Sequence, residues 1–115
     1  MLTEELKLNV QEPWFTLIKQ GKKSVEGRSG TYDKYEKWIG KIVEFYFNEE
    51  SFKVKIISIR HYKDLYDYLS AEGFKNVAPH LSSYQETVDA YHKFYTDEDI
   101  KLKGGMNGLT IEVIN

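Results

Sequence analysis

Residues 21–28, Gly-Lys-Lys-Ser-Val-Glu-Gly-Arg, bring together charged side chains whose spacing could do chemistry. Glu26 and Arg28 are two residues apart, so a regular strand would place both on one face, close enough to form an ion pair. An arginine oriented in this way suits a phosphate or a base edge, and the glutamate can accept a hydrogen bond from a base amino group. The simpler alternative is an ion pair that only supports the fold.

Lys23 and Ser24 precede this pair. In a half-buried cleft, Lys23 could hold a phosphate or carbonyl oxygen, or have its pKa lowered into a catalytic range, whereas the ordinary expectation is a surface lysine beside Lys22. The hydroxyl of Ser24 could act as a nucleophile only with a base in reach, and otherwise it is a plain strand residue.

The charge of the chain is uneven. The formal net charge is −2, which argues against a protein that coats nucleic acid by bulk electrostatics. Residues 19–41, however, carry seven Lys or Arg against three acids, while the segments on both sides are net acidic. This segment also contains Tyr35 and Trp38, which could stack on a base, although an ordinary solvated loop is equally consistent with the charge.

Composition limits the class of protein. A length of 115 residues indicates a single domain over residues 1–115, with enough hydrophobic residues for a core. The absence of cysteine excludes disulfides and thiolate sites, and His61, His80 and His92 lie too far apart in sequence for a compact metal site, so we expect neither metal nor cofactor. Without a leader-like or membrane-spanning stretch, the sequence predicts a cytoplasmic protein, or a nucleocytoplasmic one in a cell with a nucleus, and no membrane partner.

Apolar periodicity predicts the order of the elements. Residues 6–10, 24–28, 41–48, 51–62 and 109–114 fit strands, and residues 14–20, 63–73 and 82–95 fit helices. The last helix should begin with a capping box between Ser83 and Glu86. Residues 29–40 and 96–108 are expected to be loops. The pattern favours an α+β fold whose mainly antiparallel, curved sheet forms a small barrel with helices outside.

The run "PWFTLIKQGKKSVEGR" resembles the opening of the ASCH domain family, whose members carry a helix followed by Gly-x-Lys-x-x-Glu-x-Arg. In this chain the signature falls on Gly21, Lys23, Glu26 and Arg28, and the resemblance continues in order over nearly the whole sequence. It implies a PUA-like fold, a small and partly open β-barrel with flanking helices and a cleft at the signature residues. The wider superfamily includes RNA-binding domains and readers of modified bases.

Some small bacterial relatives are amidohydrolases that deacetylate N4-acetylcytidine with a lysine, a threonine and a glutamate. By resemblance, Lys23 corresponds to their lysine and Glu72 falls roughly at their glutamate, but Glu26 replaces the threonine. The catalytic candidates are therefore Lys23, Glu26 and Glu72, with Ser24 as a weaker one. Glu72 is otherwise an ordinary acid near a helix end.

Two functions follow. The first is a binding module for RNA, a nucleotide or a nucleoside, with Lys23, Glu26, Arg28, Tyr35 and Trp38 as ligand-binding residues. The alternative is an amidohydrolase that acts on an N4-acylated cytidine-type nucleoside, against which the missing threonine counts. A protein–protein adaptor is a third class that no feature of the sequence favours directly.

Overall fold

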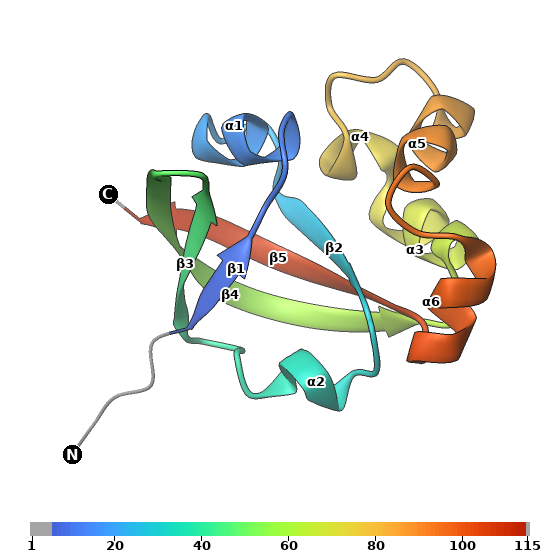
Figure 1. Cartoon of the computed structure of the whole chain (residues 1–115), viewed down its shortest axis with the longest axis horizontal. Helices are drawn as coiled ribbons and strands as arrows, with labels where there is room; N and C mark the ends of the chain where they lie inside the picture. Colours follow the sequence, from blue (N-terminus) through green and yellow to red (C-terminus); the bar gives the residue numbers. More distant parts are fainter. Residues whose placement is uncertain (1–5, 115) are drawn as a thin grey trace.

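The strands form a single five-stranded sheet in a computed structural model that describes residues 6–114. The strand order is β1-β3-β4-β5-β2; β1 runs parallel to β3, and every other neighbouring pair is antiparallel (Figure 1). The strands are β1 (Lys7–Asn9), β2 (Val25–Ser29), β3 (Ile42–Phe47), β4 (Glu50–Tyr62) and β5 (Met106–Ile114).

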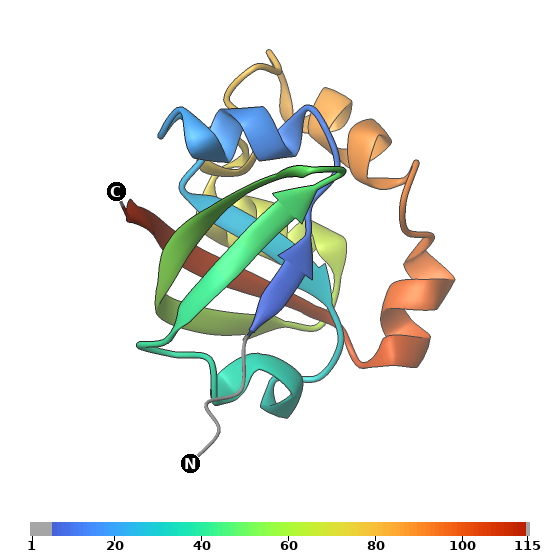
Figure 2. The same cartoon turned by 60° about the vertical axis from the view of Figure 1, so that its left-hand side comes forward.

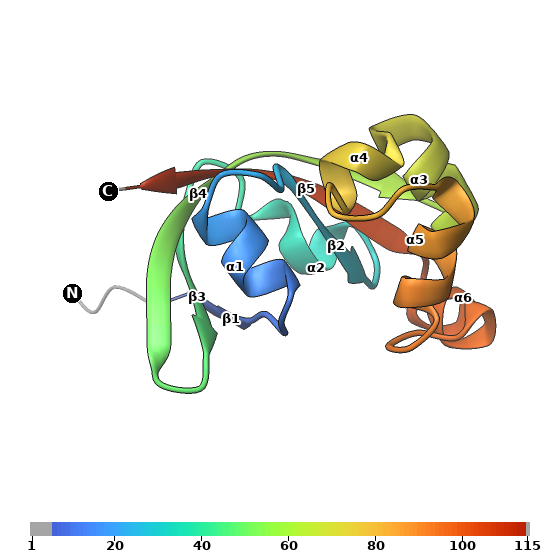
Figure 3. The same ribbon diagram turned by 90° about the horizontal axis from the view of Figure 1, so that it is seen from above.

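The sheet curls into a half-barrel with helices around it. Figure 2 shows α1 above and α2 below the curled sheet, and Figure 3 shows α3 to α6 gathered beside one part of it, away from β1 and β3. The helices are α1 (Trp14–Lys19), α2 (Asp33–Glu36), α3 (Leu65–Glu72), α4 (Phe74–Val77), α5 (Tyr84–Tyr91) and α6 (Asp97–Lys103). This architecture confirms the predicted α+β, mainly antiparallel and partly open PUA-like barrel.

Two apolar clusters pack on opposite faces of the sheet. The inner cluster fills the half-barrel and includes Phe45, Ile56 and Leu109. The outer cluster lies between the sheet and helices α3 to α6, and it includes Val25 of β2. Because side chains alternate along a strand, Glu26 lies on the other face of β2 from Val25. This alternation places Glu26 and Arg28 on the face of β2 that is turned away from helices α3 to α6.

Several predicted elements are confirmed. The hairpin joins β3 to β4 through a turn at residues 48–49, and α3 ends at Gly73 as expected. Helix α5 begins at the predicted cap, where the Ser83 side chain accepts a hydrogen bond from the backbone of Glu86. The Glu86 carboxylate in turn accepts from the backbone of Ser82, one residue earlier than a standard capping box.

The predictions for two loops and for the end of one helix were wrong. Residues 29–40 contain the short helix α2, and residues 96–108 contain α6 and the start of β5. Helix α6 has a Thr96 cap, acids in its first turn and lysines in its last, but it buries only Ile100, so it has no apolar stripe. Helix α5 ends at Tyr91, so Tyr95 lies beyond it although the predicted helix extended to residue 95. Helix α4 lies in a segment for which no element was predicted.

Gly27 lets two helices pack directly on β2. A Cβ at this position would lie 2.5 Å from the Tyr68 hydroxyl oxygen and 2.8 Å from that of Tyr91. The two hydroxyl groups are 3.0 Å apart, so they hydrogen-bond to each other directly against the strand. A side chain on Gly27 would have to push α3 or α5 away from the sheet.

We therefore expect Gly27→Ala to lower the free energy of unfolding by about 1–3 kcal/mol, the usual cost of overpacking. Ser24→Ala is the matched control, because Ser24 is exposed one residue before the same strand, and it should change stability by less than about 0.5 kcal/mol. Chemical denaturation measures both. Equal stability of Gly27→Ala and the wild type would refute this account of the packing.

Candidate functional site

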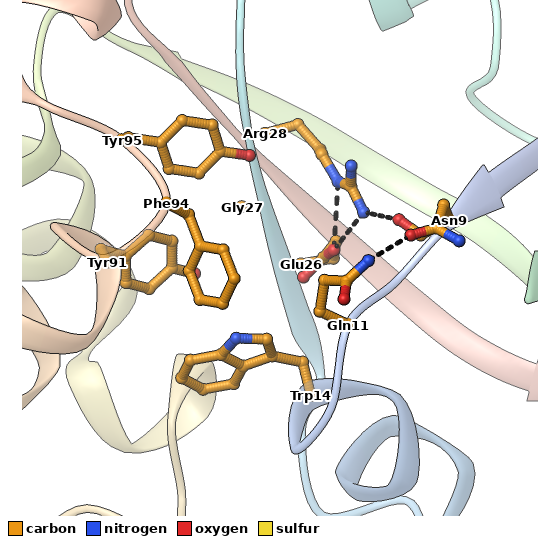
Figure 4. A pocket seen from close by; sticks show the side chains of 9 residues that line it. All are labelled: Asn9, Gln11, Trp14, Glu26, Gly27, Arg28, Tyr91, Phe94 and Tyr95. Carbon is orange, nitrogen blue, oxygen red and sulfur yellow. Dashed lines mark hydrogen bonds and ion pairs between the residues drawn. The ribbon is translucent and has the colours of Figure 1, made fainter. Parts of the chain in front are cut away.

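The site lies at the seam of the half-barrel, where its two edge strands approach each other. Strands β1 and β2 stand at opposite ends of the strand order, and within residues 6–114 no backbone ladder joins them. The Nη2 group of Arg28 crosses the seam and donates to the backbone oxygen of Asn9, at the end of β1 (Figure 4). One arginine side chain thus links the two edges.

Three charged side chains of the signature form a chain of alternating sign. Lys23 Nζ is 3.6 Å from Glu26 Oε1, and Arg28 Nε and Nη2 are 3.1 Å and 3.0 Å from Glu26 Oε2. The Glu26 carboxylate, whose side chain is only 8% exposed, is therefore neutralised from both sides. The ion pair that the spacing of Glu26 and Arg28 predicted is present.

Lys23 is buried and fully engaged. Its side chain is 0% exposed, and its ammonium group donates to the backbone oxygens of Val25 and, at 2.7 Å, of Val77 at the end of α4. Glu26 is its third partner, as an ion pair at 3.6 Å rather than a hydrogen bond. Burial lowers the pKa of Lys23 to about 8, although the Glu26 carboxylate opposes this. Lys23 thus fixes Glu26 and ties α4 to β2, and its side chain is buried away from solvent.

Arg28 keeps its charge at the edge of the pocket. Its side chain is 21% exposed. Burial acts against the charge, but the Glu26 carboxylate and then Tyr95 and Tyr35 outweigh it, so the pKa of Arg28 is raised above its ordinary value. A guanidinium oriented by a carboxylate can donate in a fixed direction.

A pocket of about 190 Å³ opens beside this pair. Figure 4 shows Glu26, Arg28 and Gln11 on one side of it and aromatic rings on the other. Its lining comes from the end of β1 and the start of α1, from β2, and from the end of α5 and the turn after it: Asn9, Gln11, Trp14, Glu26, Gly27, Arg28, Tyr91, Phe94 and Tyr95. The pocket therefore combines aromatic surfaces with a charged hydrogen-bonding pair.

Trp14 is held in place on several sides. The Lys23 ammonium lies 5.2 Å from its ring centroid, and the ring of His80 meets it edge-on at 5.1 Å. The ring of Tyr91 lies 5.9 Å away at a tilt. These contacts fix the orientation of Trp14 before any ligand enters, which reduces the entropic cost of stacking on it.

Of the predicted site residues, Glu26 and Arg28 line this pocket, and Lys23, Ser24, Tyr35, Trp38 and Glu72 do not. Tyr35 is on α2, is 6% exposed and packs in the inner core, with its ring 5.1 Å from that of Trp38. Trp38 is partly exposed and packs against the same core. Ser24 is exposed just before β2, and its side chain has no hydrogen-bond partner within residues 6–114. The roles predicted for these three residues stay predictions.

Glu72 belongs to a different cluster. Its carboxylate accepts from Nε and Nη2 of Arg60 and from the hydroxyl of Tyr62, so it joins the end of α3 to β4. It lies over Gly108 on the helix-covered side of the sheet. Lys23 and Glu26 are thus brought together, whereas Glu72 already has partners elsewhere.

Sequence reasoning missed most of the pocket wall. Apart from Glu26 and Arg28, none of its members was predicted to bind a ligand, and its aromatic members Trp14, Tyr91, Phe94 and Tyr95 fell within predicted helices. Phe94 is 49% exposed in the folded chain, so it is available to a ligand. Exposure, however, is a property of the folded chain and cannot be read from the sequence.

Neither a metal site nor a membrane span is found in the described residues. Residues 6–114 contain no group of three or more His, Cys, Asp or Glu side chains that could hold a metal ion. Among the same residues, no helix has the length and apolar character needed to cross a bilayer.

Comparison with known proteins agrees with the resemblance found in the sequence. The family model described as ASCH domain matches residues 8–103. The chain is similar to a crystal structure of hypothetical protein PH0355, with 37% identity, a TM-score of 0.79 and coverage of 96% of this chain and 100% of that one. It is also similar to a solution NMR structure of protein PF0455 from Pyrococcus furiosus, with 30% identity and a TM-score of 0.75. The match covers 97% of this chain and 99% of that one. None of the curated proteins compared matches the chain.

We expect Lys23→Met to remove a pH dependence of stability. Because the pKa of Lys23 falls from 10.5 to about 8 on folding, the unfolded chain binds more protons between these values, and the native state gains stability as pH rises. The free energy of unfolding of the wild type minus that of Lys23→Met should rise by about 1–2 kcal/mol between pH 8 and 9.5.

Chemical denaturation across this range measures the difference. Lys22→Met is the control, since Lys22 is the exposed neighbour and should give a difference that does not change with pH. A flat difference for Lys23→Met as well would show that Lys23 is not held as described.

Proposed function

Since the chain belongs to the ASCH domain family, we propose that it binds RNA, or a free nucleotide or nucleoside, in the pocket at the seam between β1 and β2. The observation that carries this proposal is the placement of aromatic rings opposite the Glu26–Arg28 pair in one pocket. Proteins that recognise single-stranded RNA stack its bases on aromatic side chains and hydrogen-bond their edges.

The positively charged segment, residues 19–41, supplies cations outside the pocket. Its exposed lysines can contact backbone phosphates of a longer RNA, which would raise the association rate in an otherwise acidic chain. Trp38, which is partly exposed beside them, keeps its predicted stacking role as part of this proposal. The exposed lysines of residues 19–41 are Lys19, Lys22, Lys34, Lys37 and Lys41.

The geometry adds no support to the amidohydrolase alternative. Lys23 is buried, Lys23 and Ser24 both lie outside the pocket lining, and Glu72 is paired with Arg60. Binding is therefore the function that we put forward. Deacetylation of N4-acetylcytidine by the wild type, at a rate well above that of Lys23→Ala, would favour hydrolysis instead.

We expect Phe94→Ala to weaken the binding of short single-stranded RNA by about 1–3 kcal/mol, the usual worth of one base stack. Phe94 is exposed and lines the pocket, so its removal takes away stacking surface without opening the core. Isothermal titration calorimetry at low salt gives the dissociation constants.

Tyr66→Ala is the matched control. Tyr66 is an aromatic residue that is 38% exposed on α3, away from the pocket, and its removal should leave the affinity unchanged. If both variants bind as the wild type does, or if the wild type binds no RNA, nucleotide or nucleoside at low salt, the proposed function is wrong.

A further inference from the structure

We propose that Trp14 determines ligand specificity: inside the pocket, its indole N–H donates a hydrogen bond to a ring nitrogen or carbonyl oxygen of the bound base. This inference rests on the proposed function and names one group that distinguishes between ligands. It is carried by an unpartnered hydrogen-bond donor on a side chain that is nine-tenths buried and faces the pocket.

The indole nitrogen of Trp14 has no partner in the protein. Trp14 is 9% exposed, and an indole has one N–H donor and no acceptor. Within residues 6–114, this N–H forms no hydrogen bond, whereas every fully buried side-chain nitrogen or oxygen in the same range has a partner. The nitrogen is therefore not enclosed in the core but is reached from the pocket that Trp14 lines.

The direction of this N–H is fixed. Figure 4 shows the nitrogen on the edge of the indole that faces the interior of the pocket and the ring of Phe94. The Lys23 ammonium lies over the indole, and the rings of His80 and Tyr91 contact it from other sides. Because these contacts hold the ring, the N–H cannot turn toward a partner elsewhere in the protein.

Neighbouring polar groups of the lining already have partners. The hydroxyl of Tyr91 is 3.0 Å from that of Tyr68, with which it hydrogen-bonds. The side-chain amide of Gln11 donates to the side chain of Asn9. The N–H of Trp14, in contrast, is a donor that the protein leaves open for a ligand.

A free donor in an aromatic wall makes the pocket selective. Before a ligand enters, water can accept from the indole N–H. A ligand that displaces this water must bring an acceptor to the same point, because a buried donor that is left unpaired weakens binding. A ligand with a C–H group at this point is therefore bound more weakly than one with a ring nitrogen or a carbonyl oxygen.

The position of Phe94 indicates which part of the ligand supplies the acceptor. Phe94 lines the same pocket and is 49% exposed, on the side toward which the indole nitrogen points (Figure 4). A base that stacks on Phe94 keeps its ring nitrogens and carbonyl oxygens at the edges of its ring. One edge can thus accept from Trp14 while the face of the base contacts Phe94.

The sharpest test replaces only the N–H. Benzothienylalanine has the shape of tryptophan with sulfur in place of the indole N–H, so it keeps the packing of Trp14. The chain has two tryptophans, and a Trp38→Phe background ensures that Trp14 alone is exchanged. The probes are the four ribonucleosides and short single-stranded RNA homopolymers. In calorimetry, the dissociation constant of the tightest probe should rise by about threefold to tenfold, the worth of one neutral hydrogen bond.

The outcomes separate this inference from the function on which it rests. The reference is the same Trp38→Phe chain with its natural Trp14, so any effect of Trp38 cancels. An unchanged dissociation constant would overturn the inference and leave the proposed function standing. If neither these probes nor free nucleotides bind, both are wrong.

Nuclear magnetic resonance tests the same contact on the unmodified protein. The isotope-labelled chain has two indole N–H signals, and Trp38→Phe identifies the one from Trp14. When the tightest probe saturates the protein, the Trp14 signal should move downfield and exchange more slowly with water. A signal that keeps both its position and its exchange rate would contradict the inference, even if the sulfur-containing chain does not fold.

Analogues of the ligand identify the acceptor. Deaza bases have C–H in place of a ring nitrogen, and thio bases have sulfur, a weaker acceptor, in place of a carbonyl oxygen. One such change should weaken binding to the Trp14 chain by about threefold to tenfold. It should have no effect on the benzothienylalanine chain, in which the donor is already absent. If no change on the base has this coupled effect, the acceptor is not on the base and the inference is wrong.

Discussion

The Glu26–Arg28 ion pair is the interaction on which the site depends. Arg28 spans the seam of an incomplete barrel, and it can do so only because Glu26, which Lys23 holds from behind, fixes its orientation. Burying such charges is costly, and a buried ion pair is often no more stabilising than apolar residues of the same size. The chain Lys23–Glu26–Arg28 is therefore better explained by the position that it gives Arg28 than by any gain in stability.

The aromatic wall depends on a second constraint, the pair of glycines at the centre of the outer face. Gly27 of β2 lies opposite Gly108 of β5 in the ladder, and the ring of Tyr68 would contact a Cβ on either of them. Helices α3 and α5 can thus approach the strands closely. This approach brings the turn after α5, with Phe94 and Tyr95, to the edge of β2, so the packing of the outer core determines where the pocket wall lies.

Local sequence signals predicted those parts of the fold and site that local geometry determines. The spacing of Glu26 and Arg28 was enough for their ion pair, and β-branched and aromatic residues on both sides of a turn signal were enough for the hairpin of β3 and β4. The link from Arg28 to Asn9 was not predictable in this way, since it depends on how far the whole sheet curls. Helix α6 was missed for a different reason, because its signals are caps and charges and only Ile100 is buried.

The position of the site on an edge strand also bears on the solubility of the fold. An open half-barrel exposes two strand edges, and unpaired edges invite association between chains. Charged side chains on an edge strand oppose such pairing, and Arg28 covers part of the gap between β1 and β2 directly. The same residues that shape the pocket thus protect the least complete part of the sheet. An apolar replacement of the pair would remove the hydrogen-bonding groups of the site and, in the same step, leave the seam open to another strand.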